Sequence, residues 1–496
     1  MESILEIIPG ILSFSILGWI LLGVVLGIIF GGTPGISTSM GIAFMLPLTF
    51  TLPLIPSIAL ILGLYVGGTS GGLITAILIN IPGTTAAIAT CWDGHPMAQR
   101  GEAGKALGIG IFYSFCGGII SFLLLITLSP IIARFALKFG AVEYFSISLF
   151  SLALISTLSG KSLAKGVAAA MFGMAFTTVG AAPLDGNMRF TFGSHALEAG
   201  FKMLPVLVGT YAVSEVLKVA ERNAPLPPAT KYKMRGFGVS MKEFREQFIN
   251  MMRSALIGTG IGLLPGLGAN ISNILSYTVA KQQSRYPEKF GTGIIDGIVA
   301  SETANNAVTG GALIPLLTVG IPGDAITAML LSAIMVQGIT PGPLMFKNHI
   351  DIVYAVFIAI FIANALMIIV EYFGLSLFLK ILLIPNYILL PIVLVMCTIG
   401  AYATNNRVFD VWSIIVFAII GYGMQKFKYP ISPFVLGYIL GNLVETNLRR
   451  AFMVTRGSFV AFLERPIAAV FFIITIVFVG LMVRSRGKNK NMASED

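Results

Sequence analysis

The chain has 496 residues, of which 56% are hydrophobic and 11% are charged, and its formal net charge is +10. Soluble domains carry about 25% charged residues, so this composition excludes an ordinary soluble protein and predicts a chain that lies mostly in lipid. The basic excess predicts no nucleic-acid partner, because its clusters in residues 218–253 and 484–490 adjoin apolar segments, as expected beside a lipid bilayer.

The apolar segments predict an all-α polytopic membrane protein. A transmembrane helix needs ~20 apolar residues, and the apolar runs between short charged or glycine-rich breaks predict about 10 to 12 spans, with some helices broken or re-entrant. The first 30 residues contain Glu2 and Glu6 but no Lys or Arg, so they lack the basic start of a cleavable secretory signal. We therefore expect this segment to be retained.

Two glycine- and proline-rich motifs occur in each half of the chain. The first half contains GIIFGGTPG from Gly27 and GGLITAILINIPGT from Gly71. The second half contains GTGIGLLPG from Gly258 and GALIPLLTVGIPGD from Gly311, at shifts of 231 and 240 residues. The duplication predicts two related repeats, and duplicated apolar segments interrupted by Gly and Pro are typical of secondary transporters.

A polar and basic stretch with three prolines separates the halves. We predict an N-terminal transmembrane repeat in residues 1–217, a basic linker in 218–250, a C-terminal transmembrane repeat in 251–483 and a basic tail in 484–496. Positive charge beside apolar spans favours the cytoplasmic side, so the linker and the tail are both expected in the cytoplasm. Whether the repeats are parallel or inverted stays open, because the number of full spans between equivalent positions is not fixed.

The four Pro-Gly breaks are the predicted substrate-binding site. A broken helix at membrane depth is tolerated only where protein or a water-filled cavity satisfies its backbone, and half-helix N-termini in such a cavity suit a carboxylate. The alternative is that the glycines only allow close helix packing. The predicted substrate-binding residues are Gly32, Thr33, Pro34, Gly35, Ser37, Thr38, Asn80, Pro82, Gly83, Thr84, Pro265, Gly266, Asn270, Asn273, Pro322 and Gly323.

A coupling cation is expected at acidic and amide side chains near these breaks. Glu302 lies in an apolar context, where an ionisable residue is costly and is therefore a functional candidate. The alternative is a carboxylate at a loop end, paired with a basic residue such as Lys289. The predicted cation-coupling residues are Glu302, Asn305, Asn306 and Asp324.

No cofactor is expected, and no metal beyond a transported Na+. The three cysteines and three histidines are far apart and lack ligand spacing. The segment from Asp93 to Glu102 is predicted to be a solvated polar turn between spans.

Two other classes of function remain alternatives to transport. An ion or anion channel would need a continuous pore. An intramembrane serine protease would use the motif Gly68-Thr69-Ser70-Gly71, but all three histidines are expected in or beside loops, away from Ser70. Gly160-Lys161-Ser162 ends like a P-loop, yet Ile155 stands where its first glycine belongs, so no ATP hydrolysis is expected. We expect no enzymatic activity.

Several long motifs carry a family resemblance. They read GGTPG, NIPGTTAAIATCWDGHPMAQRGEAGKALG, GLLPGLGANIS, SETANNAVTGGALIPLLTVGIPGDA, GITPGP, NNRVFDVW and GNLVETNLRRA. Together they closely resemble the large membrane subunit of the tripartite tricarboxylate transporters, the TctA family, over roughly Gly23 to Pro466. The family's signatures fall on the segments Gly31 to Gly35, Asn80 to Thr85, Pro265 to Asn273, Glu302 to Asn306 and Ile321 to Asp324.

The resemblance implies a secondary transporter of the bacterial or archaeal cytoplasmic membrane. Its implied partners are a small membrane subunit and an extracytoplasmic substrate-binding protein that delivers a carboxylate. The implied activity is import of a di- or tricarboxylate by symport with Na+ or H+, through alternating access to one site.

Overall fold

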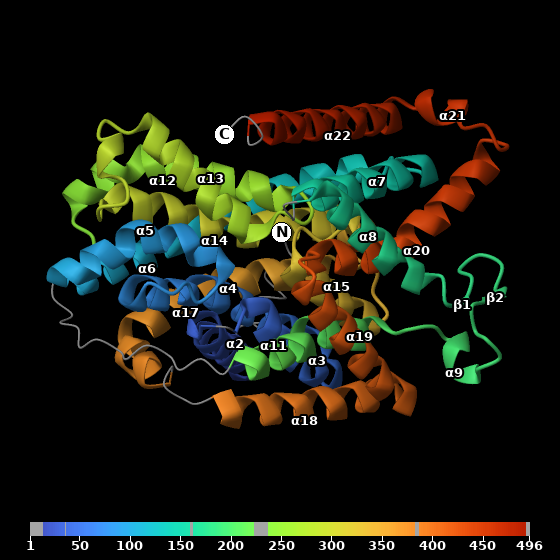
Figure 1. Cartoon of the computed structure of the whole chain (residues 1–496), viewed down its shortest axis with the longest axis horizontal. Coiled ribbons are helices and arrows are strands. Elements are labelled where there is room, and N and C mark those ends of the chain that lie inside the picture. Colours follow the sequence, from blue (N-terminus) through green and yellow to red (C-terminus); the bar gives the residue numbers. More distant parts are fainter. Residues whose placement is uncertain (1–12, 35, 159–161, 223–236, 382–385, 493–496) are drawn as a thin grey trace.

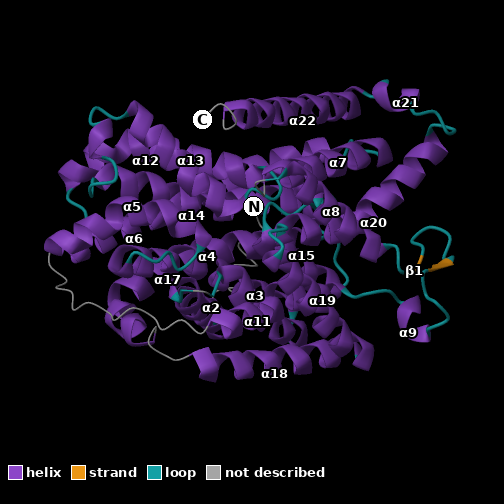
Figure 2. Ribbon diagram, viewed as in Figure 1, coloured by secondary structure: helices purple, strands orange, loops and turns teal. Residues whose placement is uncertain are grey.

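The computed structural model describes residues 13–34, 36–158, 162–222, 237–381 and 386–492, and the described chain is built almost entirely from helices (Figures 1 and 2). The first half contains α2 (Phe14–Gly32), α3 (Thr38–Thr51), α4 (Leu54–Ile79), η1 (Thr85–Ala87), α5 (Ile88–Met97), η2 (Ala98–Glu102), α6 (Ala103–Ala136), α7 (Ala141–Leu158), α8 (Leu163–Thr177), β1 (Gly180–Ala181), β2 (Met188–Arg189), α9 (His195–Glu198), α10 (Met203–Leu207), η3 (Val208–Val213) and α11 (Ser214–Arg222). The second half contains α12 (Met241–Leu263), α13 (Gly268–Gln283), η4 (Pro287–Lys289), α14 (Ile295–Val319), α15 (Ala325–Val336), α16 (Met345–Asn348), α17 (Ile350–Ile381), α18 (Asn386–Asn405), α19 (Val408–Lys426), α20 (Ile431–Val454), α21 (Val460–Leu463) and α22 (Pro466–Met492).

The predicted class, an all-α polytopic membrane protein, is confirmed by these helices. Within the described ranges, six helical segments are long and apolar enough to cross a membrane: Phe14–Gly32, Leu54–Ile79, Thr85–Ala136, Met203–Glu221, Ile350–Leu375 and Val408–Lys426. Five further apolar helices are shorter, among them α3, α8 and α15. Within the described residues, these six segments are fewer than the roughly 10 to 12 spans that the sequence predicts for the whole chain.

The two halves repeat one packing arrangement, in which α2 lies along α4 and α12 lies along α14. A Cβ atom added at Gly71 of α4 would lie 2.6 Å from the carbonyl oxygen of Ile28, and one added at Gly311 of α14 would lie 2.5 Å from that of Thr259. Ile28 and Thr259 are themselves equivalent at the shift of 231 residues. Glycine at these positions lets the two helices of each pair approach at backbone distance.

Both long helices end in the same way before a Pro-Gly break. Asn80 ends α4 with φ of 56°, and Gly320 ends α14 with φ of 78°. This left-handed conformation is open to Gly and tolerated by Asn, and it turns the chain sharply after the last helical residue. The amide of Ile321 then donates to the carbonyl of Pro315 at 3.3 Å, as Ile81 donates to Thr75 at 3.4 Å in the first half.

The prediction of a solvated turn between Asp93 and Glu102 is wrong for its first part, which lies on α5, but Arg100, Gly101 and Glu102 are exposed at a kink where Gly101 has a φ of 84°. Asp93 lies on α5 with an exposed fraction of 0%. Its Oδ1 accepts hydrogen bonds from the amides of Gly291, Gly293 and Ile294 at 2.8–3.0 Å, and its Oδ2 accepts one from the Tyr277 hydroxyl at 2.8 Å. These four donors satisfy the buried carboxylate and attach α5 of the first half to the loop before α14 of the second.

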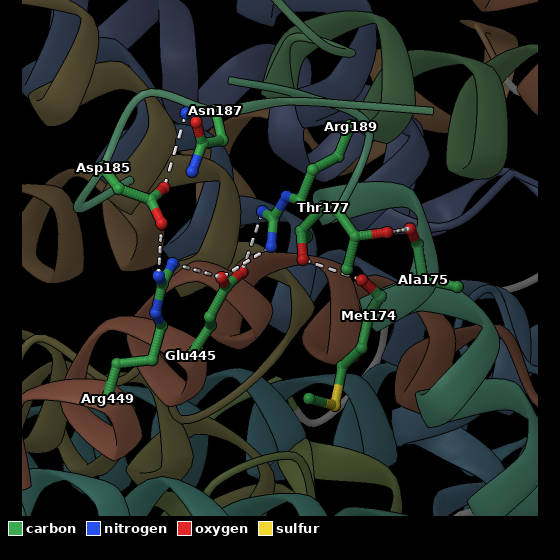
Figure 3. A network of polar contacts seen from close by, with 9 residues as sticks. Met174, Ala175, Thr177, Asp185, Asn187, Arg189, Glu445 and Arg449 are labelled. Atoms are coloured by element: carbon green, nitrogen blue, oxygen red, sulfur yellow. Dashed lines mark hydrogen bonds and ion pairs between the residues drawn. The ribbon is translucent and has the colours of Figure 1, made fainter. Parts of the chain in front are cut away.

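A small antiparallel hairpin, β1 paired with β2, projects from one end of the helical body (Figures 1 and 2). Arg189 binds Glu445 of α20 through two hydrogen bonds of 2.7 and 3.1 Å, and Arg449 binds Asp185 at 2.5 Å (Figure 3). The hydrogen bond from the Arg449 guanidinium lowers the pKa of the Asp185 carboxyl. The span Met203–Glu221 separates this hairpin from the start of the basic linker, so the two lie at opposite ends of that span.

The described part of the basic linker is attached to α6 by a charged cluster. The Glu243 carboxylate accepts hydrogen bonds from Lys105 Nζ at 2.7 Å and from the Ser240 amide at 2.8 Å. Partial burial acts to raise the pKa of Glu243, but the hydrogen bonds from Lys105 and Ser240 outweigh it and lower the pKa to about 2. Glu243 and Ser240 also form the capping box that begins α12.

Substitution of Gly31 by Ala should destabilise the α2–α4 pair. The added methyl group would overlap the carbonyl oxygen of Gly68, and overpacking of this kind costs about 1–3 kcal/mol. Gly18 lies on the same helix with open space around it, so Gly18→Ala is the matched control and should be neutral or slightly stabilising. Chemical unfolding in detergent measures both, and equal midpoints for the two variants would contradict the packing described here.

Replacing Glu243 with Gln should weaken the fold in a pH-dependent way. Because the folded-state pKa of about 2 lies below the ordinary 4.5, the stabilisation is full above about pH 4.5 and is lost as the pH falls toward 2. At neutral pH we expect a loss of ~1.5–3 kcal/mol in the free energy of unfolding. The exposed Glu246 serves as control, since Glu246→Gln should change stability by less than about 0.5 kcal/mol. If the loss of unfolding free energy in Glu243→Gln stayed constant from pH 7 to about 3, the lowered pKa of Glu243 would be contradicted.

Candidate functional site

A polar cavity of about 350 Å³ lies where the helix breaks of the two halves meet. It is bounded by residues of α3, α4 and η1 from the first half and of α13 and α15 from the second, with contributions from η3 and α20. The lining residues are Ser37, Thr38, Ser39, Tyr65, Thr69, Thr84, Thr85, Ala86, Tyr211, Gly266, Leu267, Gly268, Ala269, Asn270, Ile271, Asp324, Ala325, Ile326, Ser432 and Leu436. The polar lining is mostly hydroxyl and amide groups, with one carboxylate and no Lys or Arg.

Four helical segments begin at this cavity. Ser37 caps α3 by accepting a hydrogen bond from the Met40 amide at 3.1 Å, and Asp324 caps α15 by accepting one from the Thr327 amide at 2.8 Å. The helix α13 begins at Gly268, and η1, which continues into α5, begins after Thr84. The first amides of a helix lack intrahelical partners and carry partial positive charge, so four such ends make the cavity favourable for an anion.

Direct hydrogen bonds hold the breaks together. The Gly266 amide donates to the carbonyl of Gly323 at 2.6 Å, which links the two breaks of the second half. The Thr85 hydroxyl donates to Asn270 Oδ1 at 2.6 Å, which links the first half to the second across the cavity. Elements more than 180 residues apart in sequence therefore form one wall.

The predicted substrate-binding residues divide into two groups. Ser37, Thr38, Thr84, Gly266 and Asn270 line the cavity. The residues Gly32, Thr33, Pro34, Asn80, Pro82, Gly83, Pro265, Asn273, Pro322 and Gly323 are not among its lining residues, and Gly35 lies outside the described residues. Several of these shape the breaks instead. A Cβ at Gly83 would overlap the carbonyl oxygen of Gly31, and Asn273 accepts a hydrogen bond from the Ala89 amide at 2.8 Å.

The predicted cation-coupling residues are also divided. Asp324 lines the cavity, whereas Glu302, Asn305 and Asn306 lie on α14 behind the wall, with exposed fractions of 0–1%. Glu302 accepts hydrogen bonds from the hydroxyls of Thr90 and Ser114, so the alternative of a loop-end carboxylate paired with Lys289 is wrong. Asn305 donates to the carbonyl of Thr69 at 3.2 Å, and Thr69 lines the cavity. This hydrogen bond connects the three α14 residues Glu302, Asn305 and Asn306 to the cavity wall.

The predicted site residues do not include six polar lining residues, Ser39, Tyr65, Thr69, Thr85, Tyr211 and Ser432. Tyr65 and Thr69 are four residues apart on α4, so they lie on one face of the helix, and this spacing was a usable signal. The Tyr65 hydroxyl donates to Asp324 Oδ2 at 2.5 Å and so orients the only carboxylate among the lining residues. Tyr211 and Ser432 belong to neither repeated motif, and only tertiary packing brings them to the cavity.

The structure also places the residues of the protease motif. The Ser70 hydroxyl donates to Glu371 Oε2 at 2.9 Å, which gives Ser70 a carboxylate partner. His95 lies within α5 rather than in a loop, and its Nδ1 is 3.0 Å from the carbonyl oxygen of Ile77. Within the described residues, no cluster of three or more His, Cys, Asp or Glu side chains is arranged to hold a metal ion.

The fold and the cavity define a multi-pass membrane protein in which two repeated halves with broken helices enclose one polar site. The family model of the tripartite tricarboxylate transporter TctA family matches residues 17–436. The chain therefore belongs to the TctA family and is a subunit of a tripartite tricarboxylate transporter.

Two proteins of Agrobacterium vitis are similar to this chain. The "Uncharacterized 52.8 kDa protein in TAR-I ttuC' 3'region" is 35% identical over 480 residues, covering 96% of this chain and 95% of that protein. The "Uncharacterized protein in TAR-II ttuC' 3'region" is 37% identical over 241 residues, covering 48% of this chain and 100% of that protein. No solved structure matches the chain.

Removal of the Tyr65 hydroxyl should destabilise the protein. Tyr65→Phe leaves Asp324 with one donor fewer, and hydrogen bonds to charged groups contribute ~1.5–3 kcal/mol to stability. Tyr113→Phe is the matched control, because the Tyr113 hydroxyl is buried on α6 without a hydrogen-bond partner in the described chain. In thermal unfolding in detergent, the midpoint temperature of Tyr65→Phe should be lower than that of the wild type. The midpoint temperature of Tyr113→Phe should be nearly unchanged. Equal midpoints would argue against this hydrogen bond.

Proposed function

We propose that this chain is the transmembrane subunit through which a binding-protein-dependent secondary transporter imports a di- or tricarboxylate, by symport with Na+ or H+ and alternating access to the cavity. The observation that carries the proposal is the meeting of four helical N-terminal ends at one cavity whose lining residues include no Lys or Arg. Neutral donors bind an anion without fixing it by full charge, so the anion remains free to leave on the other side.

The size and chemistry of the cavity support a small polycarboxylate. A volume of about 350 Å³ is at the lower end of the range for small-molecule sites. The hydroxyl of Thr38 and the NH2 group of Asn270 supply directional hydrogen bonds, while the helix ends supply positive potential. The broken helices of both halves provide donors on opposing walls, as a substrate with two or three carboxylates requires.

A co-transported cation would offset the negative charge of the substrate and of Asp324. Asp324 reaches the cavity, and it is held by Tyr65 and by its own helix end. Glu302, Asn305 and Asn306 form a second polar group one hydrogen bond behind the wall. Each group contains a carboxylate, and the second adds the amide oxygens of Asn305 and Asn306; such oxygens suit a hard cation, so both groups are candidates for the coupling site.

The partners and orientation follow from family membership and charge. We propose that a small membrane subunit and an extracytoplasmic substrate-binding protein complete the transporter in a bacterial or archaeal cytoplasmic membrane. With the linker 218–250 and the tail 484–496 in the cytoplasm, the β1–β2 hairpin would lie on the outer side, because the span Met203–Glu221 separates it from the linker. The hairpin face would then be the side that receives the substrate-binding protein.

Uptake of labelled carboxylates into proteoliposomes tests the proposal. The vesicles contain this chain with the small subunit, and the binding protein is added outside under an imposed Na+ or H+ gradient. Saturable uptake that requires the binding protein and collapses with the gradient is expected. Flux that does not saturate and needs no gradient would instead indicate a channel.

Substitution of Thr38 tests the cavity itself. Thr38→Val keeps the shape and removes one hydroxyl, so we expect the KM for the carboxylate to rise by roughly 2- to 12-fold, which corresponds to ~0.5–1.5 kcal/mol. Thr127→Val is the control, because the exposed Thr127 hydroxyl bonds only to backbone carbonyls of its own helix. An unchanged KM in Thr38→Val would remove this hydroxyl from the binding site.

A further inference from the structure

A further buried carboxylate, Glu371, lies in the same helical core and was not singled out by sequence reasoning. It is on α17, inside the candidate span Ile350–Leu375, and its exposed fraction is 0%. Its Oε2 accepts the hydrogen bond from the Ser70 hydroxyl at 2.9 Å. Its Oε1 has no hydrogen-bond partner in the described chain.

An ionised carboxylate in this position would be poorly compensated. A buried charge is costly unless it is paired and fully hydrogen-bonded, and the described part of the chain forms no ion pair with Glu371. A group in this setting is stable when it carries a bound positive charge, and the simplest one is a proton.

The helices packed against α17 are α2, α4, α6 and α16, and their ionisable residues do not supply this charge. There are none on α2, and the others are Tyr65 on α4, Lys105, Tyr113, Cys116 and Arg134 on α6, and Lys347 on α16. Tyr65 is bonded to Asp324, and Lys105 is bonded to Glu243 and to the carbonyl of Gly238. The Tyr113 hydroxyl has no hydrogen-bond partner in the described chain.

The partners of Glu371 suit a proton better than a metal cation. Na+ needs several oxygen ligands, whereas a proton needs one carboxylate oxygen and leaves the other free to accept a hydrogen bond. Glu302 has two hydroxyl partners, Thr90 and Ser114, but Glu371 has only Ser70 among the described residues. The free Oε1 is the atom on which a proton would reside.

Glu371 is also connected to the transport cavity. Ser70 follows Thr69 on α4, and Thr69 both lines the cavity and accepts the hydrogen bond from Asn305. The hydrogen bond from the Ser70 hydroxyl therefore ties Glu371 to α4, the helix whose residues Tyr65 and Thr69 line the cavity.

We propose that Glu371 is a proton-binding site of this protein, joined by its hydrogen bond with Ser70 to α4, which lines the transport cavity with Tyr65 and Thr69. The carboxylate binds one proton, and the same proton leaves from the carboxyl group when the site is exposed to the opposite solution, so no bond in the substrate changes. The link to transport rests on the proposed function, whereas the protonation of Glu371 does not depend on it.

Infrared difference spectroscopy of the purified full chain tests the protonation. The wild type should show the C=O band of a protonated carboxylic acid that decreases as the pH is raised. Glu371→Gln should lose this band. Glu143→Gln should keep it, because Glu143 is a buried carboxylate with a cationic partner, Arg465. Ser70→Ala should keep the band at a shifted frequency, which maintains the test if Glu371→Gln fails to fold.

Absence of the band in the wild type at every pH, or its persistence in folded Glu371→Gln, would overturn the proposal. The coupling to transport has a separate readout, the pH profile of carboxylate uptake in proteoliposomes. Glu371→Gln should abolish the pH dependence, and Glu143→Gln should retain it. An unchanged profile in Glu371→Gln would overturn the coupling, while a band without any wild-type uptake would overturn only the proposed function.

Discussion

Backbone polar groups at membrane depth impose the constraint on which this structure depends. A helix that stops inside lipid leaves amides and carbonyls that cost free energy unless they are satisfied. Here the breaks satisfy part of this demand among themselves, as in the bond from the Gly266 amide to the carbonyl of Gly323. The remaining amides at the helix starts face the shared cavity. The same constraint therefore produces the compact junction of the two halves and brings four helix N-termini to its centre.

The two halves are alike in backbone and different in charge. Asn80 and Gly320 occupy equivalent left-handed positions, and four residues later the equivalent residues are Thr84 and Asp324. Both of these last residues line the cavity, but only Asp324 brings a carboxylate and a capping box. The repeated backbone thus places helix ends on both walls of the cavity. The difference between Thr84 and Asp324 gives only the second half a carboxylate there.

The buried carboxylates of the core are satisfied to different degrees, and this difference separates structure from function. Asp93 accepts four hydrogen bonds and attaches α5 to the second half, as a fixed structural contact would. Glu302 has hydroxyl partners, and Glu371 has one hydroxyl and a free oxygen. Groups that gain or lose a cation during a cycle must be less completely bound than groups that only hold helices together, because exchange requires a free ligand position.

The sequence by itself determined the class, the repeats and the positions of the breaks, because hydropathy, Gly and Pro act locally on the backbone. It also indicated Ser37, Thr38, Thr84, Asn270 and Asp324, which flank those breaks directly. Only the tertiary structure decided that Glu302 lies behind the wall, that Asp93 is buried, and that Tyr65, Tyr211 and Ser432 reach the cavity. These placements depend on which helix faces pack together across hundreds of residues, and no local pattern in the chain encodes that choice.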